Sequence, residues 1–413
     1  MEPIMKMHNK TQIKIRLLII IALLLLFSGC KGDTKTKTVE KVNIGVLLPL
    51  SGDLASHGED MKKGVELAVE EVNVAGGIAS LGKAKLQLIV GDSQSNPDIG
   101  AQEAERLIEE EGVVAIICYA SSISMMATQV AERLETPILI VATSDSLTER
   151  GFRYTFRTNP RGEFYGRDQV RFLMDLDELA GYPVHRVALL YENSDFGTAM
   201  ALAQKKMLRE YGLELVAEVS YVSKGASDMS AEVARILAAN PDAILEAAFL
   251  NDSILIARAL SEAGSIVPVV DSAGGTIFPE YIESLGPLAN GTLTVAEYSK
   301  YAPGAKELND RFRARSGVDI TGNSAHAYQA VLVLKDGLER IGSVDREELR
   351  NALAATDLSS GPQMVLPAKR LRFDTDGQNE FAGLYVVQIQ DGEWVPVWPV
   401  EFATAKVRLK KQE

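Results

Sequence analysis

Cysteine and histidine are scarce in this chain of 413 residues. There are two cysteines: Cys30 follows an apolar leader, and Cys118 lies in the apolar stretch VVAIICYA. We therefore expect no intramolecular disulfide and a buried, unreactive Cys118. Beyond the leader the histidines are His57, His185 and His326, and none has a His or Cys neighbour at ligand spacing. This pattern predicts no metal site.

Sequence motifs of catalysis are missing as well. The chain has no G-x-S-x-G, no H-E-x-x-H and no G-x-x-x-x-G-K-[ST], so we expect neither an enzyme nor a cofactor. Ser121 and Ser122 could supply a nucleophile only with a base that the sequence does not reveal. The stretch D-T-D-G at 374–377 predicts a turn, because it lacks the later Glu of a calcium-binding loop.

Basic residues are also fewer than acidic ones. The formal net charge is −13, and removing residues 1–29, which carry four Lys/Arg and one Glu, makes it −16. No basic stripe interrupts this acidic chain, which argues against a nucleic-acid partner.

The N-terminal segment predicts an exported lipoprotein. Four basic residues precede the apolar run Leu17–Phe27, whose eleven residues are fewer than the roughly 20 that span a bilayer. The following FSGC resembles a bacterial lipobox. We expect cleavage after residue 29, lipidation of Cys30, a flexible tether over 30–41 and a location on the periplasmic face or cell surface. An uncleaved signal anchor is the alternative.

The remaining chain reads as repeated βα units. Its length of about 380 residues exceeds the roughly 250–300 at which one core stops growing, so two domains are expected. Apolar strands such as VNIGVLLPL, LQLIVGD, RVALLY and AILEAAF alternate with segments of helical periodicity. This pattern predicts an α/β fold with two doubly wound parallel-sheet lobes. Ser56 and Glu59 have capping-box spacing and predict the start of the first helix.

Ligands of such folds bind at the carboxyl ends of strands. In this sequence those ends are rich in Ser, Thr, Asp, Asn and Gly: PLSGDLASHG, GDSQSNP, YASSIS, VATSDSLT, YENSDFGTA, FLNDS and VDSAGGT. The same residues are ordinary helix caps. Several of them at one sheet edge nevertheless favour a shared site for a small polar ligand.

Long segments resemble the leucine/isoleucine/valine-binding proteins, type I periplasmic binding proteins that serve ABC transporters. The similar segments include KVNIGVLLPLSGDLASHGEDMKKGVELAVEEVNVAGGI, GVVAIICYASSIS, TPILIVATSDSLTERGFRYTFRT, RVALLYENSDFGTAMA and FDTDGQNEFAGLYVVQIQDGEW. The resemblance implies two lobes joined by a hinge of three crossovers. The first lobe would comprise 42–158 and 296–378, and the second 159–295 and 379–405.

The resemblance also implies the ligand contacts. Ser121 and Ser122 match the residues that hold the ligand carboxylate. The ammonium site corresponds to Val141-Ala142-Thr143-Ser144, where either Thr143 or Ser144 takes the Thr role. Three side chains match the aromatic wall of the site: His57, Phe196 and Phe249.

This sequence departs from the family at one position of the ligand site. Amino-acid binders commonly carry an acidic residue in the loop matching VDSAGGT. An ungapped match places Gly274 there, and only a shift brings Asp271 near. An ammonium without a counter-charge is costly to bury, so amides and organic acids stay open as ligands.

The function implied is capture of a small solute by a monomeric lipoprotein that delivers it to an ABC transporter permease. The alternatives are a ligand-sensing domain for a signalling partner and an exported hydrolase.

Overall fold

Two sheets organise the computed structural model, which describes residues 39–302, 304–361 and 370–410. The first sheet is parallel throughout, with strand order β2-β1-β3-β4-β5. Its strands are β1 (Lys41–Leu48), β2 (Lys85–Asp92), β3 (Ala115–Tyr119), β4 (Ile138–Val141) and β5 (Thr155–Arg157). β4 is buried along its whole length, as expected of a strand in a parallel sheet covered on both faces.

Three helices connect the strands of the first sheet: α2 (Ala55–Val74), α3 (Pro97–Glu109) and α4 (Ser121–Arg133). Asn96 caps α3, because its Oδ1 accepts from the N–H of Asp98 and of Ile99. The capping box predicted at Ser56 is wrong. Helix α2 begins at Ala55 after Leu54, without a side-chain cap, so Ser56 already lies in the first turn, beyond the N-cap position.

The second sheet has the order β14-β13-β10-β9-β8-β6-β7. Its parallel strands are β6 (Arg186–Glu192), β7 (Glu214–Tyr221), β8 (Ala243–Ala247), β9 (Val269–Asp271) and β10 (Leu293–Ala296). The antiparallel strands β13 (Tyr385–Gln390) and β14 (Glu393–Trp398) extend one edge. The helices of this part are α5 (Gly162–Ala180), α6 (Asp195–Tyr211), α7 (Ser230–Leu237), α8 (Leu250–Glu262) and α9 (Pro279–Leu285).

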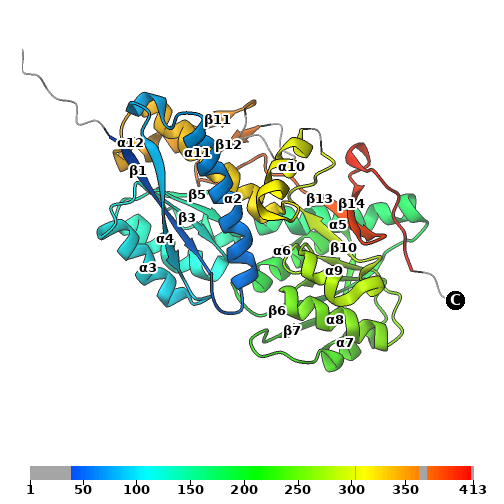
Figure 1. Ribbon diagram of the computed structural model, residues 1–413. Helices are drawn as coiled ribbons and strands as arrows, with labels where there is room; N and C mark the ends of the chain where they lie inside the picture. Colours follow the sequence, from blue (N-terminus) through cyan, green and yellow to red (C-terminus); the bar gives the residue numbers. More distant parts are fainter. Residues whose placement is uncertain (1–38, 303, 362–369, 411–413) are drawn as a thin grey trace, which may run out of the picture. The chain divides into compact units, whose positions relative to one another are not determined.

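The chain then returns to the first sheet through α10 (Ala305–Ser316), α11 (Gly322–Ile341) and α12 (Arg346–Ala354). Helix α11 lies beside α2 (Figure 1). The hydroxyl of Tyr328 on α11 donates to Glu71 on α2 at 2.5 Å. A short two-stranded sheet, β11 (Asp357–Leu358) with β12 (Leu371–Arg372), precedes β13.

The chain thus passes between the two sheets three times: after β5, after β10 and before β13. Side chains join the first and third crossing. Gln378 Nε2 donates to Asn159 O, and Asn379 Nδ2 donates to Thr158 O, both at 3.0 Å. The predicted α/β class with two parallel-sheet lobes and a three-crossover hinge is confirmed.

The predicted signal peptide (1–29), Cys30 and most of the predicted tether lie outside the described residues. Within the described residues, none of the helices is long and apolar enough to cross a membrane.

Candidate functional site

A cavity lies between segments that follow strands of both sheets. Its walls come from the residues after β3 and β4 and from those after β6, β8, β9 and β10. These are the carboxyl ends of parallel strands, where helix N-termini present unpaired N–H groups. The lining residues are Leu54, Tyr119, Ala120, Ser121, Ser122, Val141, Ala142, Thr143, Asn159, Tyr165, Ser194, Phe196, Phe249, Ser272, Ala273, Gly274, Glu297 and Asn323.

Polar groups line the cavity at the N-terminus of α4. Ala120, just before the helix, has φ +73°, a conformation that costs a non-glycine residue about 1–3 kcal/mol and is typical of functional sites. The Ser121 oxygen accepts from the N–H of Thr143 and of Ser144, both at 3.3 Å, and lies 3.5 Å from the Thr143 hydroxyl. Hydroxyl groups thus meet at the positive end of a helix, which favours a carboxylate.

The loop that carries Thr143 is held by a buried arginine. Arg157 is fully buried, and its guanidinium donates to Thr143 O at 3.2 Å, to Ser144 O at 2.8 Å and to the Thr148 hydroxyl at 3.0 Å. Burial lowers the pKa of Arg157 to about 10, so the side chain stays charged at neutral pH. The charged guanidinium donates its hydrogen bonds to carbonyl groups of the loop, which fixes the position of Thr143.

Two aromatic rings also line the cavity. The rings of Phe196 and Phe249 lie 5.3 Å apart between centroids at an interplanar angle of 30°. Both belong to segments of the second sheet, at the start of α6 and of α8. An apolar ligand group would displace water from these two rings.

His57 lies behind this wall on α2. Its ring contacts Phe249 at 5.6 Å and Phe278 at 4.5 Å between centroids. Its Nε2 lies 2.7 Å from the carbonyl oxygen of Gly274. Burial lowers the pKa of His57 to about 4, so the imidazole is neutral at pH 7 and Nε2–H donates this bond. The bond joins a helix of the first sheet to the loop after β9.

A carboxyl group also reaches the cavity, from Glu297 directly after β10. The Tyr165 hydroxyl donates to Glu297 Oε1, and Asn159 Nδ2 lies 3.5 Å from the same oxygen. Oε2 lies 3.4 Å from His326 Nε2. Burial raises the pKa of Glu297 to about 7, although the bonds from Tyr165 and Asn159 lower it.

Asp271 is placed differently from Glu297. Its Oδ2 accepts from the hydroxyl of Thr276 at 2.7 Å and of Thr294 at 3.3 Å. It therefore holds the loop after β9, and its carboxyl group is not among the lining groups within the described part of the chain.

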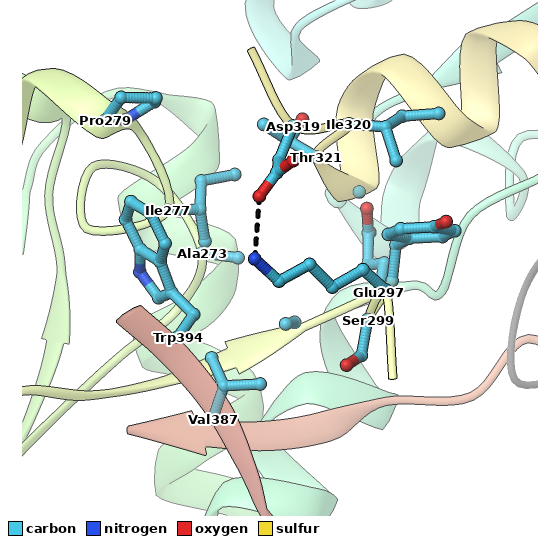
Figure 2. A pocket seen from close by; sticks show the side chains of 14 residues that line it. Ala273, Ile277, Pro279, Glu297, Ser299, Asp319, Ile320, Thr321, Val387 and Trp394 are labelled. Atoms are coloured by element: carbon cyan, nitrogen blue, oxygen red, sulfur yellow. Dashed lines mark hydrogen bonds and ion pairs between the residues drawn. The ribbon is translucent and has the colours of Figure 1, made fainter. Parts of the chain in front are cut away.

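A second cavity adjoins the first, and Ala273 and Glu297 line both. Figure 2 shows Ile277, Pro279, Val387 and Trp394 on one side of it and the loop with Asp319 and Thr321 on the other. Lys300 also lines this cavity, but its ammonium is already bonded to Asp319 at 2.8 Å and to Glu393 at 3.0 Å. Because this ammonium is already paired, Lys300 is less able to bind an anionic solute there.

The residues that the sequence singled out fall into two groups. Lining the first cavity are Ser121, Ser122, Ala142, Thr143, Phe196 and Phe249. Among the described residues, His57, Ser144 and Asp271 lie outside that lining and act on it through hydrogen bonds: His57 to Gly274, Ser144 to Ser121, and Asp271 to Thr276.

Sequence reasoning missed Asn159, Tyr165 and Glu297. Glu297 had a signal, because it directly follows the apolar strand LTVA, as other site residues follow theirs. Asn159 and Tyr165 lie at a crossover without a strand-end signal.

The fold and this site define a solute-binding protein with two α/β lobes. A family model described as periplasmic binding protein matches residues 41–393. A relative named Leu/Ile/Val-binding protein homolog 8, from Brucella abortus (strain 2308), is 32% identical over 390 residues, which cover 91% of this chain and 95% of the relative. Homolog 7 from Brucella suis biovar 1 (strain 1330) is 29% identical over 89% of this chain and 94% of its own length.

Solved structures agree with this assignment. A leucine-binding protein LivK from Thermotoga maritima aligns with a TM-score of 0.76 and 25% identity over 86% of this chain and 97% of its own. LivJ from Streptococcus pneumoniae, solved with isoleucine, aligns with a TM-score of 0.75 and 23% identity over 86% of this chain and 97% of its own. The chain belongs to the type I periplasmic binding proteins, in the leucine/isoleucine/valine-binding family. Members of this family are substrate-binding proteins rather than enzymes.

Proposed function

We propose that this protein captures a branched-chain amino acid, or a related amide or organic acid, in the first cavity and delivers it to an ABC transporter permease. The observation that carries the proposal is the polarity of the cavity. Ser121 and Thr143 bring hydroxyl groups to the lining at the N-terminus of α4, and Phe196 and Phe249 bring two aromatic rings to it. A molecule with a carboxylate and a compact apolar group is complementary to both kinds of lining group. The names of the relatives and of the solved structures point to the same ligands.

Capture would proceed by closure of the two lobes over the ligand. The bond from His57 to Gly274 O joins the two sides directly, so it stabilises the closed arrangement relative to an open one. A ligand that contacts both sides shifts the population further toward closure. The closed form of a monomer would then dock on the permease.

Lipidation of Cys30 would keep the protein at the membrane where the permease lies. This part of the proposal rests on the FSGC sequence after an apolar leader. One acyl chain gives only marginal anchoring, and a second chain makes it stable.

A thermal-shift screen followed by calorimetry tests the proposal. The screen should contain the twenty amino acids, their amides and short organic acids. A ligand at about 100 times its Kd adds about 2.7 kcal/mol to apparent stability. We expect a branched-chain amino acid or a close relative to raise the melting temperature by several degrees. A screen in which no member of these classes binds would overturn the proposed function.

A further inference from the structure

Glu297 is buried beside the cavity without a cationic partner. Its side chain is 4% exposed, and among the described residues no lysine or arginine is paired with it. Its neighbours are the neutral groups of Tyr165, Asn159 and His326, because burial lowers the pKa of His326 to about 3. An ionised carboxylate in such a place costs several kcal/mol unless a positive charge joins it.

The other titratable groups near Glu297 do not supply that charge. Tyr119 on β3 is a lining residue, and burial raises its pKa. Asp60 on α2 also interacts with Tyr119 and is itself acidic. Lys300, three residues after Glu297, is bonded to Asp319 and Glu393. The N-terminus of α11 contributes only a partial positive charge, worth about 0.3–1 kcal/mol at an exposed site.

The surrounding backbone is shaped to admit Glu297. A Cβ on Gly322, the first residue of α11, would lie 2.9 Å from the Cβ and from Oε2 of Glu297, too close for any side chain. The loop position that the family resemblance assigns to an acidic residue has no such room. A Cβ on Gly274 would lie 2.3 Å from Ala248 O and 2.9 Å from the Phe196 ring.

The position of Glu297 also suits an ammonium group. Asn159 connects Glu297 to the end of β4, because its Oδ1 accepts from the Ala142 N–H at 3.0 Å while its Nδ2 faces Glu297 Oε1. Glu297, Ala142 and Thr143 line the same cavity as Ser121, which stands at the carboxylate-favouring helix end. An α-amino acid places its two charged groups one carbon apart, which matches a site with both features.

We propose that Glu297 is the counter-ion for the ammonium group of an α-amino acid, in place of the loop acid that is glycine here. This inference rests on the proposed function and narrows its ligand class. Amides without an ammonium and simple carboxylates would leave Glu297 unpaired and should bind weakly.

A proton balance follows from this assignment. Without ligand, the Glu297 carboxyl is partly protonated near neutral pH, since its pKa is about 7. An ammonium favours the ionised form, so binding releases the proton. Affinity for an amino acid should therefore rise with pH, by roughly 20- to 30-fold between pH 5.5 and 7.5. A purely structural carboxyl group would give no such change.

The test uses isothermal titration calorimetry with leucine, leucinamide and 4-methylpentanoate, the last being leucine without its amino group. We expect wild-type protein to bind leucine best and to release close to one proton at pH 6, measured in two buffers of different ionisation enthalpy. Glu297→Gln should weaken leucine binding at pH 7.5 by at least about 30-fold and abolish the proton release. Asp271→Asn is the matched control and should retain the pH dependence.

The outcomes separate the two proposals. If 4-methylpentanoate binds as tightly as leucine, or if leucine binds without proton release, the role of Glu297 is refuted while solute capture stands. Loss of the pH dependence in Asp271→Asn but not in Glu297→Gln would assign the role to Asp271 instead. If no amino acid binds the wild-type protein, both proposals fail. The ligand preference and proton release of the wild-type protein test the role of Glu297 even if Glu297→Gln does not fold.

Discussion

Replacing His57 with phenylalanine separates the packing of its ring from its hydrogen bond. Phenylalanine keeps an aromatic ring against Phe249 and Phe278 but cannot donate to Gly274 O, which lies 2.7 Å from Nε2. Because His57 is only 1% exposed, the variant leaves a buried acceptor without a partner. That costs about 1–3 kcal/mol.

This change should destabilise the closed arrangement, because the Gly274 carbonyl can bind water when the two lobes are apart. The apparent affinity for leucine should then fall by roughly 5- to 150-fold, as measured by calorimetry. His185→Phe is the control, because His185 is exposed. Unchanged leucine affinity in a folded His57→Phe protein would refute the reasoning that this bond holds the closed form.

Four further substitutions test the ligand contacts, the fold around the site and the membrane anchor. Ser121→Ala should weaken leucine binding by about 1.5–3 kcal/mol, and unchanged affinity would place the carboxylate elsewhere. Arg157→Met should lower the free energy of unfolding, measured in urea, by about 2–4 kcal/mol, because it removes the charged hydrogen bonds to the Thr143 and Ser144 carbonyls and to the Thr148 hydroxyl; a smaller loss would contradict the role of Arg157 in holding this loop. Burial raises the folded-state pKa of Glu297 from 4.5 to about 7. The contribution of this group to the free energy of unfolding therefore falls as pH rises through that window. Glu297→Gln should therefore gain about 3 kcal/mol relative to wild type between pH 4.5 and 8, and parallel pH profiles would contradict this. Cys30→Ala should abolish acylation and membrane retention, measured by fractionation and mass spectrometry, and a mutant processed like the parent would refute the lipobox.

Much of the fold is predictable from local sequence pattern. Strand β4 reads as an unbroken apolar run, and Asn96-Pro97-Asp98 predicts the start of α3, because these signals act within a few residues. The predicted start of α2 was wrong because Ser56-x-x-Glu59 has capping-box spacing without the backbone conformation that capping requires. A spacing alone does not fix the backbone at the preceding residue.

The site was only partly predictable, for a different physical reason. Ser121 and Thr143 follow their strands directly, so topology brings them together. Glu297 meets Asn159 and Tyr165 only because two separate crossings of the chain lie side by side. Such contacts between segments more than a hundred residues apart have no local signal. The family resemblance placed the missing acid in the loop of Gly274, where a side chain has no room.

A crystal structure of the protein with its tightest amino-acid ligand would show directly whether the first cavity holds the solute. We expect the ligand carboxylate within hydrogen-bond distance of Ser121 or Thr143 at the N-terminus of α4, and the ligand side chain against Phe196 and Phe249. A ligand seated in the second cavity beside Lys300 and Trp394, or on the outer surface, would contradict it.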